Sequence, residues 1–571
     1  MPDLTQGLYG PDKIARFRKT GAWTDATIDQ VFTDRVAERP DAVALVDPAN
    51  NLELVGTAPR RLTWRELDDE VTALAARLLD AGIEPFDVIG VHMPNGIELV
   101  ELYLAAWRIG AVVSPLAMQY REYEIVTMGV AADFAAMVTV PHFGDRETAA
   151  EALALAECLP NLKFVATLTA EPAAEPVDGA VAIVSAPAGA ADRERVAAHD
   201  YVADPNHALT ICWTSGTESA PKGVPRAHYD WLSFAWAGVD APRLTGDDVL
   251  LNPFPMINMA AFVGKLLPWL HTGATLVQHQ PFDASTFFGQ IVAEKVTYTV
   301  APPALLLMLL RNEELRSRLD LSSLSRVGSG SAPLQPVTVR GWQEEMGIAV
   351  INFFGSNEGI GLLSSPEDFP DPDDRARYFP RYGAPGITWA SRVSEWITLK
   401  LVDQDTGEEI TEPGRVGELH IDGPMVFAGY LNGEQLASPF DDEGFLRSGE
   451  LFQIEGEHNQ YLRYVDRAKD LIVRGGMNIA PAELEALISA HPAVAEVAVI
   501  GRPCEVMGER VHVVLSLQPE SALELPELVS FLKQRQIASY KLPESLEVLP
   551  VLPRNPVGKL LKRDLRAALV P

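Results

Sequence analysis

The feature that most constrains the fold is an alternation of short apolar runs with longer segments of helical periodicity. The runs AVALV (42–46) and DVIGV (87–91) have the length and branched composition of buried strands. Residues 64–82 follow the first run and residues 97–108 follow the second, each with the apolar spacing of a helix. Strands that alternate with helices are typical of parallel sheets covered by helices. We therefore expect an α/β protein.

The same pattern continues through most of the chain. Further strand-like runs lie at residues 274–279, 296–301 and 349–354. Near residues 395–411 the pattern changes, and the letters DTG (405–407) suggest a hairpin turn, which predicts a smaller antiparallel β unit. Residues 169–198, rich in Ala, Pro, Glu and Asp, predict a solvated excursion between core elements. A chain of 571 residues, 47% of them apolar, is long enough for at least two domains.

Charge and cysteine usage exclude several classes of protein. Lys and Arg number 47 against 78 Asp and Glu, for a net charge of −31, so a nucleic-acid backbone would be repelled nearly everywhere. Cys158, Cys212 and Cys504 lie far apart and predict neither a disulfide framework nor a metal knuckle. The chain starts without the apolar core of a signal peptide, and its apolar stretches are interrupted before membrane-spanning length. We expect a soluble protein of the cytoplasm without a nucleic-acid partner or a membrane span.

The stretch WTSGTESAPKGVPRAH (213–228) has the residue types of an anion-binding loop. Hydroxyl side chains surround a glycine that permits close backbone approach, and a lysine adds positive charge, which together suit a triphosphate. Taken alone, the loop fits an ordinary polar turn equally well. It is not a Walker A loop, because Pro221 precedes Lys222 and no Ser or Thr follows.

Five further motifs follow this loop in a fixed order, and together they favour the anion-binding loop over the ordinary polar turn. They are GSGSAPL (328–334), FFGSNEG (353–359), SGELF (448–452), VDRAKDLIVRGGMNI (465–479) and PRNPVGKLLKR (553–563). With the loop, they resemble the adenylate-forming superfamily, in the branch of the acyl-CoA synthetases and aryl-acid AMP ligases. The resemblance runs from LTWREL (62–67) to nearly the last residue.

The resemblance implies a reaction and an architecture. A carboxylate attacks the α-phosphate of ATP to give an acyl-adenylate and pyrophosphate, and the thiol of CoA then attacks the activated carbonyl. Because both partners of the first step are anions, the site needs Mg²⁺, amide and hydroxyl donors and a mobile lysine. The implied fold is a large N-terminal domain of parallel helix-covered sheets with a small β unit, residues 1–465, and a small mobile α+β C-terminal domain, residues 466–571, with a hinge at 466–470.

The resemblance also assigns the ATP site. The loop at residues 214–222 would grip the β- and γ-phosphates, Phe354 would stack on adenine, Asn357 would lie near the α-phosphate and Glu358 would hold Mg²⁺ together with Thr217. Glu450 would bind the ribose, one methylene farther out than the usual aspartate, and Arg467 would assist at the ribose or phosphate. The complete predicted set is Thr214, Ser215, Gly216, Thr217, Lys222, Gly330, Ser331, Ala332, Pro333, Phe354, Gly355, Asn357, Glu450 and Arg467.

The mobile parts are assigned in the same way. By resemblance, Lys559 contacts both the attacking carboxylate and the α-phosphate, and with Glu358 it forms the predicted catalytic pair. Lys469 would be the hinge pivot. Arg474, Gly475 and Gly476 would enter after adenylation to shape a thiol tunnel, where glycine lets backbone approach a pantetheine arm.

The segment NPFPMINMAAFVGK (252–265) bears on the acid. Asn258 stands where relatives have a His or aromatic gate, and Met259 and Gly264 stand where hydroxybenzoate-activating relatives have hydrogen-bonding residues. An apolar pocket of Met259, Phe262, Val263 and Gly328 predicts an apolar acyl group and disfavours a ring hydroxyl. The alternative is that Met259 and Phe262 are helix core.

A second departure from the family pattern lies in the loop itself. Glu218 and Ser219 replace a Thr-Gly pair and bring a carboxylate beside a polyanion, so we expect Glu218 to point to solvent or to share a metal.

The main prediction is an ATP-dependent acyl-CoA synthetase for an apolar acid. The alternatives are a stand-alone ligase that loads a carrier protein's phosphopantetheine, and a degenerate nucleotide-binding protein without catalysis. Glu358 and Lys559 argue against the last, because a binding module has no evident need for a mobile lysine.

Overall fold

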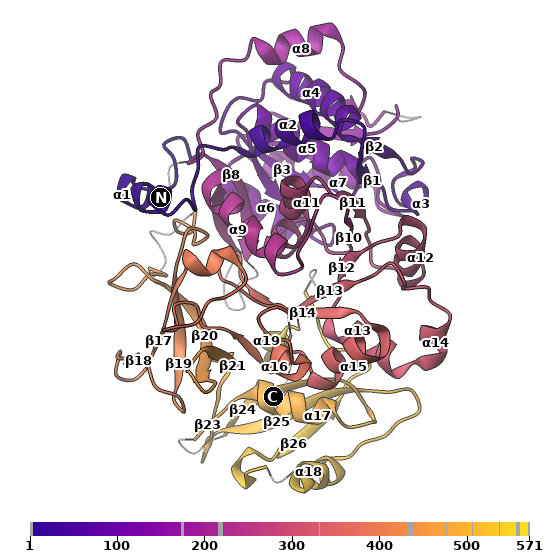
Figure 1. Cartoon of the computed structure of the whole chain (residues 1–571). Coiled ribbons are helices and arrows are strands. Elements are labelled where there is room, and N and C mark those ends of the chain that lie inside the picture. The colour runs from indigo at the N-terminus through magenta and orange to yellow at the C-terminus, as the bar shows by residue number, and fades with distance from the viewer. Residues whose placement is uncertain are drawn as a thin grey trace.

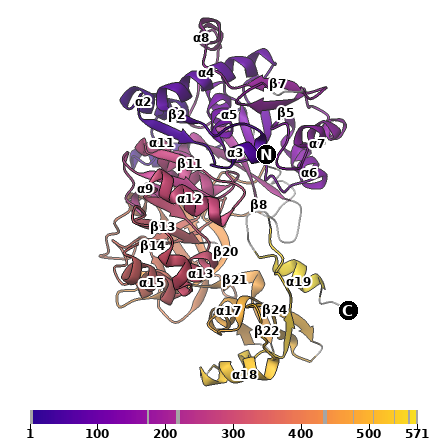
Figure 2. The same ribbon diagram turned by 90° about the vertical axis from the view of Figure 1, so that its right-hand side faces the viewer.

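Two mostly parallel sheets, an antiparallel sheet and a separate C-terminal sheet succeed one another along the chain (Figures 1 and 2). The computed structural model describes residues 4–172, 176–214, 221–330, 332–431, 438–474, 477–504, 506–535, 537–555 and 560–568. The C-terminal part, yellow in both views, lies at the opposite end of the molecule from helix α8 (Ala190–Ala197).

The first sheet holds seven strands within the described residues. In spatial order they are β7 (Val181–Val184), β6 (Phe164–Thr169), β5 (Phe134–Thr139), β3 (Val88–His92), β4 (Val112–Pro115), β8 (Ala208–Thr214) and β9 (Lys222–Ala227). All neighbours pair in parallel except β8 and β9, which pair antiparallel with Thr214 opposite Lys222. The predicted phosphate loop therefore begins and ends at two residues that pair with each other across β8 and β9.

The second sheet has eight strands, again counting only the described chain. Their order is β15 (Gly361–Ser364), β14 (Ala349–Gly355), β13 (Arg326–Gly330), β12 (Tyr298–Val300), β10 (Val249–Asn252), β11 (Thr275–Gln278), β1 (Val43–Val46) and β2 (Arg61–Thr63). The inner pairs are parallel and the two outermost pairs are antiparallel.

Helices cover these sheets, and one lies between them. The helices of this part are α1 (Pro11–Lys19), α2 (Ile28–Glu38), α3 (Asn51–Val55), α4 (Trp64–Asp80), α5 (Ile97–Arg108), α6 (Glu122–Ala132), α7 (Thr148–Ala154), α9 (His228–Asp240), α10 (Met259–Ala261), α11 (Leu267–Thr272), α12 (Ala284–Glu294), α13 (Pro303–Arg311), α14 (Glu313–Ser317), α15 (Pro336–Met346) and α16 (Pro372–Arg377). Helix α5 is buried on all sides from Ile97 to Trp107. Its Trp107 indole donates to the carbonyl of Leu209 in the first sheet at 3.0 Å, and its Tyr103 hydroxyl donates to the carbonyl of Met256, after β10, at 2.7 Å.

The helix predicted at residues 64–82 is α4, and its start shows why it forms there. Thr63 caps the helix, with its hydroxyl accepting from the backbone nitrogen of Glu66, while the Glu66 carboxylate accepts from the backbone nitrogen of Thr63 at 2.8 Å. The other predicted elements are present as well: the helix at 97–108 is α5, and the strands at 42–46, 87–91, 274–279, 296–301 and 349–354 are β1, β3, β11, β12 and β14.

The predicted excursion at residues 169–198 is only partly solvated. It contains edge strand β7, which pairs with β6, and helix α8. Just after β7, the Ser185 hydroxyl donates to the buried carboxylates of Glu70 and Glu101 at 2.7 and 2.6 Å. The prediction of a plain excursion was wrong for this part, because β7 is short, lies at a sheet edge and is largely exposed, which gives it no clear apolar pattern.

The third sheet is the small β unit predicted near residues 395–411. In the described residues it runs β16 (Tyr378–Pro380), β21 (Tyr461–Arg467), β20 (Leu446–Glu455), β19 (Val416–Asp422), β17 (Thr398–Val402) and β18 (Glu409–Ile410), all antiparallel. The predicted turn joins β17 to β18, and Gly407 adopts φ +74° there.

The fourth sheet forms the C-terminal part. It runs β23 (Met477–Ile479), β22 (Ile472–Arg474), β25 (Gly508–Leu517) and β24 (Val494–Cys504), with β26 (Ser545–Val548) beside β25; its helices are α17 (Pro481–Ser489), α18 (Leu525–Gln534) and α19 (Lys562–Ala568). The change of sheet falls between Arg467, the end of β21, and Ile472, the start of β22, across the short helix Ala468–Asp470. The predicted hinge at 466–470 overlaps this passage.

No helix in the described part of the chain combines the length and the apolar character that a membrane span requires.

Candidate active site

Asn357 lies in the turn between β14 and β15 and joins two segments that are far apart in the sequence. Its amide nitrogen donates a hydrogen bond to the carbonyl of Trp213 in β8 at 3.1 Å. Its amide oxygen accepts one from the backbone nitrogen of Met259, the first residue of α10, at 2.9 Å. The side chain therefore holds the strand that leads into the predicted phosphate loop against the helix start in the predicted acid segment.

A buried arginine supports the same turn. Arg226 in β9 is 0% exposed and donates to the carbonyl of Asn357 at 2.9 Å. Its Nε lies 3.2 Å from a carboxylate oxygen of Asp230, and its guanidinium lies over the Trp231 ring at 4.6 Å. Reasoning from the sequence missed Arg226, and the only available signal was an Arg four residues before an Asp at the start of a helix.

Glu358 and Lys222 approach one tyrosine from two of the predicted phosphate-binding segments. The Tyr430 hydroxyl donates to the Glu358 carboxylate at 3.0 Å, and the Lys222 ammonium lies 4.9 Å from the centre of the same ring. Burial, and next the Glu358 charge, raise the pKa of Tyr430, so its hydroxyl stays a donor. Tyr430 was also missed, because nothing in FAGYLN (427–432) marks it as an active-site residue.

The surroundings of Glu358 fit a magnesium ion that arrives with its nucleotide. Mg²⁺ in phosphate sites is commonly held by one or two carboxylates plus the phosphates and water. Within the described residues, no group of three or more His, Cys, Asp or Glu could hold a metal by itself. Glu358 is half-buried and shares Tyr430 with Lys222, and a carboxylate in this position matches the nucleotide-borne case.

Phe354 lies at the end of β14 among other aromatic rings. It contacts the Phe452 ring edge to face, with centroids 5.2 Å apart and planes at 89°, and the Tyr464 ring at 5.5 Å. These contacts fix the ring, while its half-buried position leaves area for a base to stack on. The opposite wall begins at Gly330, which pairs with Phe353 and whose Cβ, if present, would lie 2.5 Å from the Phe353 carbonyl. Ala332 and Pro333 follow it at the surface.

Glu450 and Arg467 face each other on β20 and β21 as paired residues. Arg467 Nε donates to one carboxylate oxygen of Glu450 at 3.0 Å, and the Tyr464 hydroxyl donates to the other at 3.1 Å. Although burial acts against it, the Glu450 charge raises the pKa of Arg467, which keeps the guanidinium charged.

The predicted acid segment divides into a cap and a core. Asn258 caps α10, with its side-chain oxygen accepting from Ala260 N at 3.0 Å. Met259 is half-buried, and its Sδ and Cε occupy the space that a side chain at Gly355 would need, since a Cβ there would lie 2.2 Å from Cε. Phe262 is 0% exposed and stacks on Trp231 with centroids 5.0 Å apart. Of the two interpretations, core packing describes Phe262 and the 4%-exposed Val263, whereas Met259 borders the site.

Gly328 lies in β13 against aromatic residues of the two neighbouring strands. A Cβ on Gly328 would lie 2.6 Å from the Phe353 ring and 2.9 Å from the Tyr298 hydroxyl. A side chain at this position would therefore displace both groups.

The C-terminal residues are described only in part. Arg474 forms a bidentate ion pair with Glu544, with both N–O distances 3.1 Å, inside the C-terminal part. Lys469 lies in the short helix Ala468–Asp470, where the sheets change. Seven of the predicted residues lie outside the described ranges: Ser215, Gly216, Thr217, Ser331, Gly475, Gly476 and Lys559. Their assignments stay predictions.

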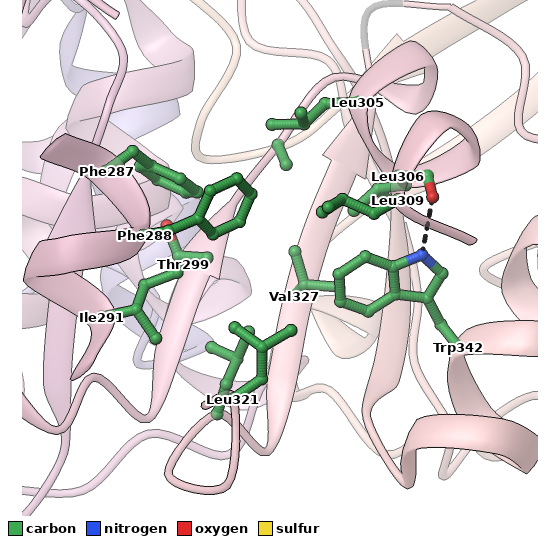
Figure 3. A pocket seen from close by; sticks show the side chains of 12 residues that line it. Phe287, Phe288, Ile291, Thr299, Leu305, Leu306, Leu309, Leu321, Val327 and Trp342 are labelled. Carbon is green, nitrogen blue, oxygen red and sulfur yellow. Dashed lines mark hydrogen bonds between the residues drawn. The ribbon is translucent and has the colours of Figure 1, made fainter. Parts of the chain in front are cut away.

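An apolar cavity under the second sheet is not part of this site. It lies between α12, α13 and α15, and the Trp342 indole on its wall donates to the Leu306 carbonyl at 2.9 Å (Figure 3). Its volume is about 10 Å³, which is at the lower limit for one water molecule. Its wall residues Thr299 and Val327 alternate along β12 and β13 with Tyr298 and Gly328, so it opens on the opposite face of the sheet.

The chain matches two protein families that together span most of its length. Residues 32–431 match the AMP-binding enzymes, and residues 483–559 match the AMP-binding enzyme C-terminal domain. The chain belongs to the AMP-binding enzyme family.

Individual relatives align over nearly the whole chain. The 3-[(3aS,4S,7aS)-7a-methyl-1,5-dioxo-octahydro-1H-inden-4-yl]propanoyl:CoA ligase of Mycobacterium tuberculosis is 30% identical, over 95% of this chain and 98% of that protein. The medium-chain fatty-acid–CoA ligase of Escherichia coli is 29% identical, over 98% and 93%. The crystal structure of the anthranilate CoA ligase AuaEII with anthranoyl-AMP has a TM-score of 0.79 at 20% identity, over 95% of this chain and 97% of that one, and so shares the fold. The predicted superfamily and fold class are confirmed.

Proposed function

We propose that the chain is an ATP-dependent acyl-CoA synthetase. It activates a carboxylic acid as the acyl-adenylate, releases pyrophosphate and transfers the acyl group to the thiol of CoA. The observation that carries the proposal is the Asn357 amide, which bonds β8 before the phosphate loop and Met259, the first residue of α10 within the acid segment. One turn thus brings together the two places where the reacting anions would bind, with Glu358 as the next residue.

The residues around this turn supply what two approaching anions require. Lys222 adds positive charge beside the phosphate loop, and Glu358 would hold Mg²⁺, whose charge supports phosphoryl chemistry when it is bound. Phe354 presents a face to adenine, and the Glu450–Arg467 pair lies where a ribose would follow. Lys559 provides the donor that reaches both the attacking carboxylate and the α-phosphate.

We propose that residues 1–465 bind ATP and the acid, and that residues 466–571 move as a unit about residues 466–470. The change of sheet between Arg467 and Ile472 supports a flexible passage at this place. In one orientation Lys559 completes the adenylation site. In the other, the segment with Arg474, Gly475 and Gly476 replaces it and lines the path of the thiol.

We propose an apolar acid as substrate, because Met259 and the Phe353 ring border the site where the acyl group would extend. The two relatives described above act on a polycyclic propanoic acid and on medium-chain fatty acids, and both classes belong in the first substrate panel. We further propose that the enzyme works in the cytoplasm.

Two rival functions make different predictions. A carrier-protein ligase would form the adenylate but need a protein-bound pantetheine as acceptor. A degenerate nucleotide-binding protein would release no pyrophosphate. The presence of Glu358, Lys222 and the Asn357 bonds around one turn supports the catalytic alternatives.

The test is pyrophosphate release from ATP across a panel of apolar acids, with and without CoA, for the native chain and for Lys559→Ala. Release that CoA accelerates and Lys559→Ala abolishes supports the proposal. Adenylate that accumulates unchanged by CoA would favour the carrier-protein ligase. Equal activity of Lys559→Ala would contradict the mechanism.

A further inference from the structure

Lys265 lies in the protein interior, although lysine is almost never fully buried unless it is paired. It lies in the π-helical turn Phe262–Leu266, directly after α10, and its side chain is 0% exposed. In the part of the chain that the structure describes, its Nζ has no hydrogen-bond partner. A buried amine without a partner is costly to a fold, so such groups are rare unless they have a task.

Lys265 contacts an aromatic residue, Tyr298, whose polar atom also lacks a hydrogen-bond partner within the described residues. Nζ lies 3.5 Å from the centre of the Tyr298 ring. Tyr298, in β12, is also 0% exposed, and its hydroxyl has no hydrogen-bond partner among the described residues. Two buried donors therefore lie within one side-chain length of each other.

These donors lie at the inner end of the acid segment. The Tyr298 hydroxyl is 2.9 Å from the position that a Cβ of Gly328 would take, and the Phe353 ring is 2.6 Å from it. Gly264, next to Lys265, is buried, yet apart from its two chain neighbours and the backbone of its own helix no described atom lies within 4 Å of where its Cβ would be. Open space beside a buried glycine marks a hollow in the interior at this turn.

Among the residues that the structure describes, no carboxylate pairs with Lys265. Arg326 and Asp248, the charged groups that act on it, form an ion pair with each other. Burial, and next the charge of Arg326, lower the pKa of Lys265, which favours the neutral amine in the empty protein. A neutral amine and a phenol can both donate to one oxygen acceptor. A π-helical turn is a common means of presenting a side chain to a functional site.

We propose that Lys265 and Tyr298 form the inner end of the acyl pocket and donate hydrogen bonds to an oxygen acceptor that the substrate carries far from its reacting carboxyl. The substrate class is then an otherwise apolar acid with a remote ketone or a second carboxylate. This inference rests on the proposed function, since it assigns the far end of that function's acid site. It narrows the proposed substrate class from apolar acids in general to apolar acids with a single remote polar group.

The test uses acids of one chain length that differ only at the remote end: octanoic acid, 7-oxooctanoic acid and octanedioic acid. The native chain should favour 7-oxooctanoic acid or octanedioic acid, which carry an oxygen acceptor at the remote end, over octanoic acid. The preference in kcat/KM for pyrophosphate release should be on the order of 10²-fold. The preferred acid then identifies the acceptor as ketone or carboxylate. Lys265→Met keeps the length of the side chain and should reduce that preference to about 3-fold or less, with octanoic acid turned over at least as well as before.

Two further variants separate recognition from structure. Tyr298→Phe should lose part of the preference, roughly 10-fold, because one donor remains. Lys400→Met removes a lysine that is 11% exposed and pairs with Asp441 at 2.9 Å in the third sheet. It should leave the acid preference unchanged, so a general effect of losing a largely buried lysine would appear in both lysine variants.

Ligand binding provides a readout that does not depend on turnover. In the native chain, the rise in melting temperature should be largest for the preferred acid with a remote oxygen. In Lys265→Met, the extra rise over octanoic acid should disappear. If an acid binds in a Lys265-dependent way but no pyrophosphate is released, the proposed function is overturned, whereas the assignment of Lys265 to an acid-binding pocket stands. Native preference for octanoic acid, or the same ranking in Lys265→Met, would overturn the inference and leave the proposed function standing.

Discussion

The two regions that contribute to the candidate site are the first region, which comprises the three sheets up to Arg467, and the C-terminal part from Ile472 onward, and they are held in different ways. The turn around Asn357 is fixed by hydrogen bonds from buried or half-buried groups, among them the Arg226 donation to its carbonyl and the Tyr430 donation to Glu358. The C-terminal part is tied internally by more exposed ion pairs, such as Arg474 with Glu544, whose side chains are 20% and 29% exposed. Contacts between the two regions include the Gln335 amide and the Ser489 hydroxyl at 2.6 Å.

This difference matches two separate tasks. Binding two anions next to each other requires donors whose positions are set before the substrates arrive, because reorganisation during the reaction would raise the barrier. Moving a lysine in and out of the same site requires contacts that break at small cost. The predictions below test whether changes in the first region alter both half-reactions while changes in the second separate them.

The largest expected effect is that of Lys559→Ala. Adenylation, measured as acid-dependent pyrophosphate release, should fall roughly 10²- to 10³-fold because one transition-state donor is lost. Thioester formation from a supplied acyl-adenylate and CoA should stay within about 3-fold of the native rate, because the lysine has left the site by then. Equal losses in both half-reactions would remove the distinction between the two regions.

Glu358→Gln should come next, because it keeps the shape of the side chain and removes the charge. We expect kcat/KM for adenylation to fall about 10²-fold and the Mg²⁺ concentration for half-maximal rate to rise about 10-fold. Tyr430→Phe is the matched control, since it leaves the carboxylate in place and removes only the 3.0 Å bond that orients it. Its loss should be about 10-fold. A normal Mg²⁺ dependence in Glu358→Gln would refute the assigned ligand.

Asn357→Ala should reduce activity about 10-fold, with higher KM for both ATP and the acid. It removes two hydrogen bonds worth about 1 kcal/mol each and loosens β8 from α10. Asn352, in β14 just before this turn, donates to the carbonyls of Arg375 and Ala376 at 3.2 and 3.1 Å, outside the site. Asn352→Ala should lose comparable stability in urea unfolding and keep both KM values. If both variants change KM alike, Asn357 has only a structural role.

Much of the frame could be predicted from the sequence, because it depends on local periodicity. The strand at residues 349–354 and the helix at 64–82 are visible as spacing of apolar side chains, whereas β7 is too short and exposed to leave such a pattern. The motif order gave the family and hence the candidate residues.

The contacts that organise the site could not be predicted, because they join residues distant in sequence. Nothing local to Arg226 shows that its guanidinium will meet the carbonyl of Asn357, 131 positions later. In the sequence, Lys265 is visible only as a charge within the apolar stretch at residues 260–270. Its lack of a partner is a property of the packed interior and not of the segment in which it lies.

A smaller effect is expected for Glu450→Gln. The amide keeps one acceptor for ribose but loses the charge that holds Arg467 at 3.0 Å, so KM for ATP should rise about 5- to 10-fold with little change in kcat. Glu455→Gln is the control on the same strand, where Arg463 donates to Glu455 at 3.1 Å away from the predicted ribose. Its KM for ATP should be native. An unchanged KM in Glu450→Gln would exclude Glu450 from the nucleotide site.

The last prediction concerns stability and distinguishes the two regions by the sign of a pH effect. In the first region Asp47 is 2% exposed, and burial, with the nearby Glu98 charge, raises its pKa from 3.8 to about 7. Between about pH 4 and 7 the folded protein then holds a proton that the unfolded chain has released, so this group's contribution to stability falls as pH rises through that window. Asp47→Asn should lack that decline in urea midpoints measured from pH 5 to 8.

In the C-terminal part Asp470 behaves in the opposite way. Burial acts to raise its pKa, but Lys562 and the 2.9 Å ion pair with Arg566 hold the pKa below its ordinary value. The stability it contributes is present above pH 3.8 and is lost as pH falls through the lower folded pKa, so Asp470→Asn should be destabilised at pH 7 and should approach the native midpoint in acid. Slopes of the same sign for both carboxylates would contradict the contrast between a buried, proton-holding first region and a C-terminal part held by ion pairs.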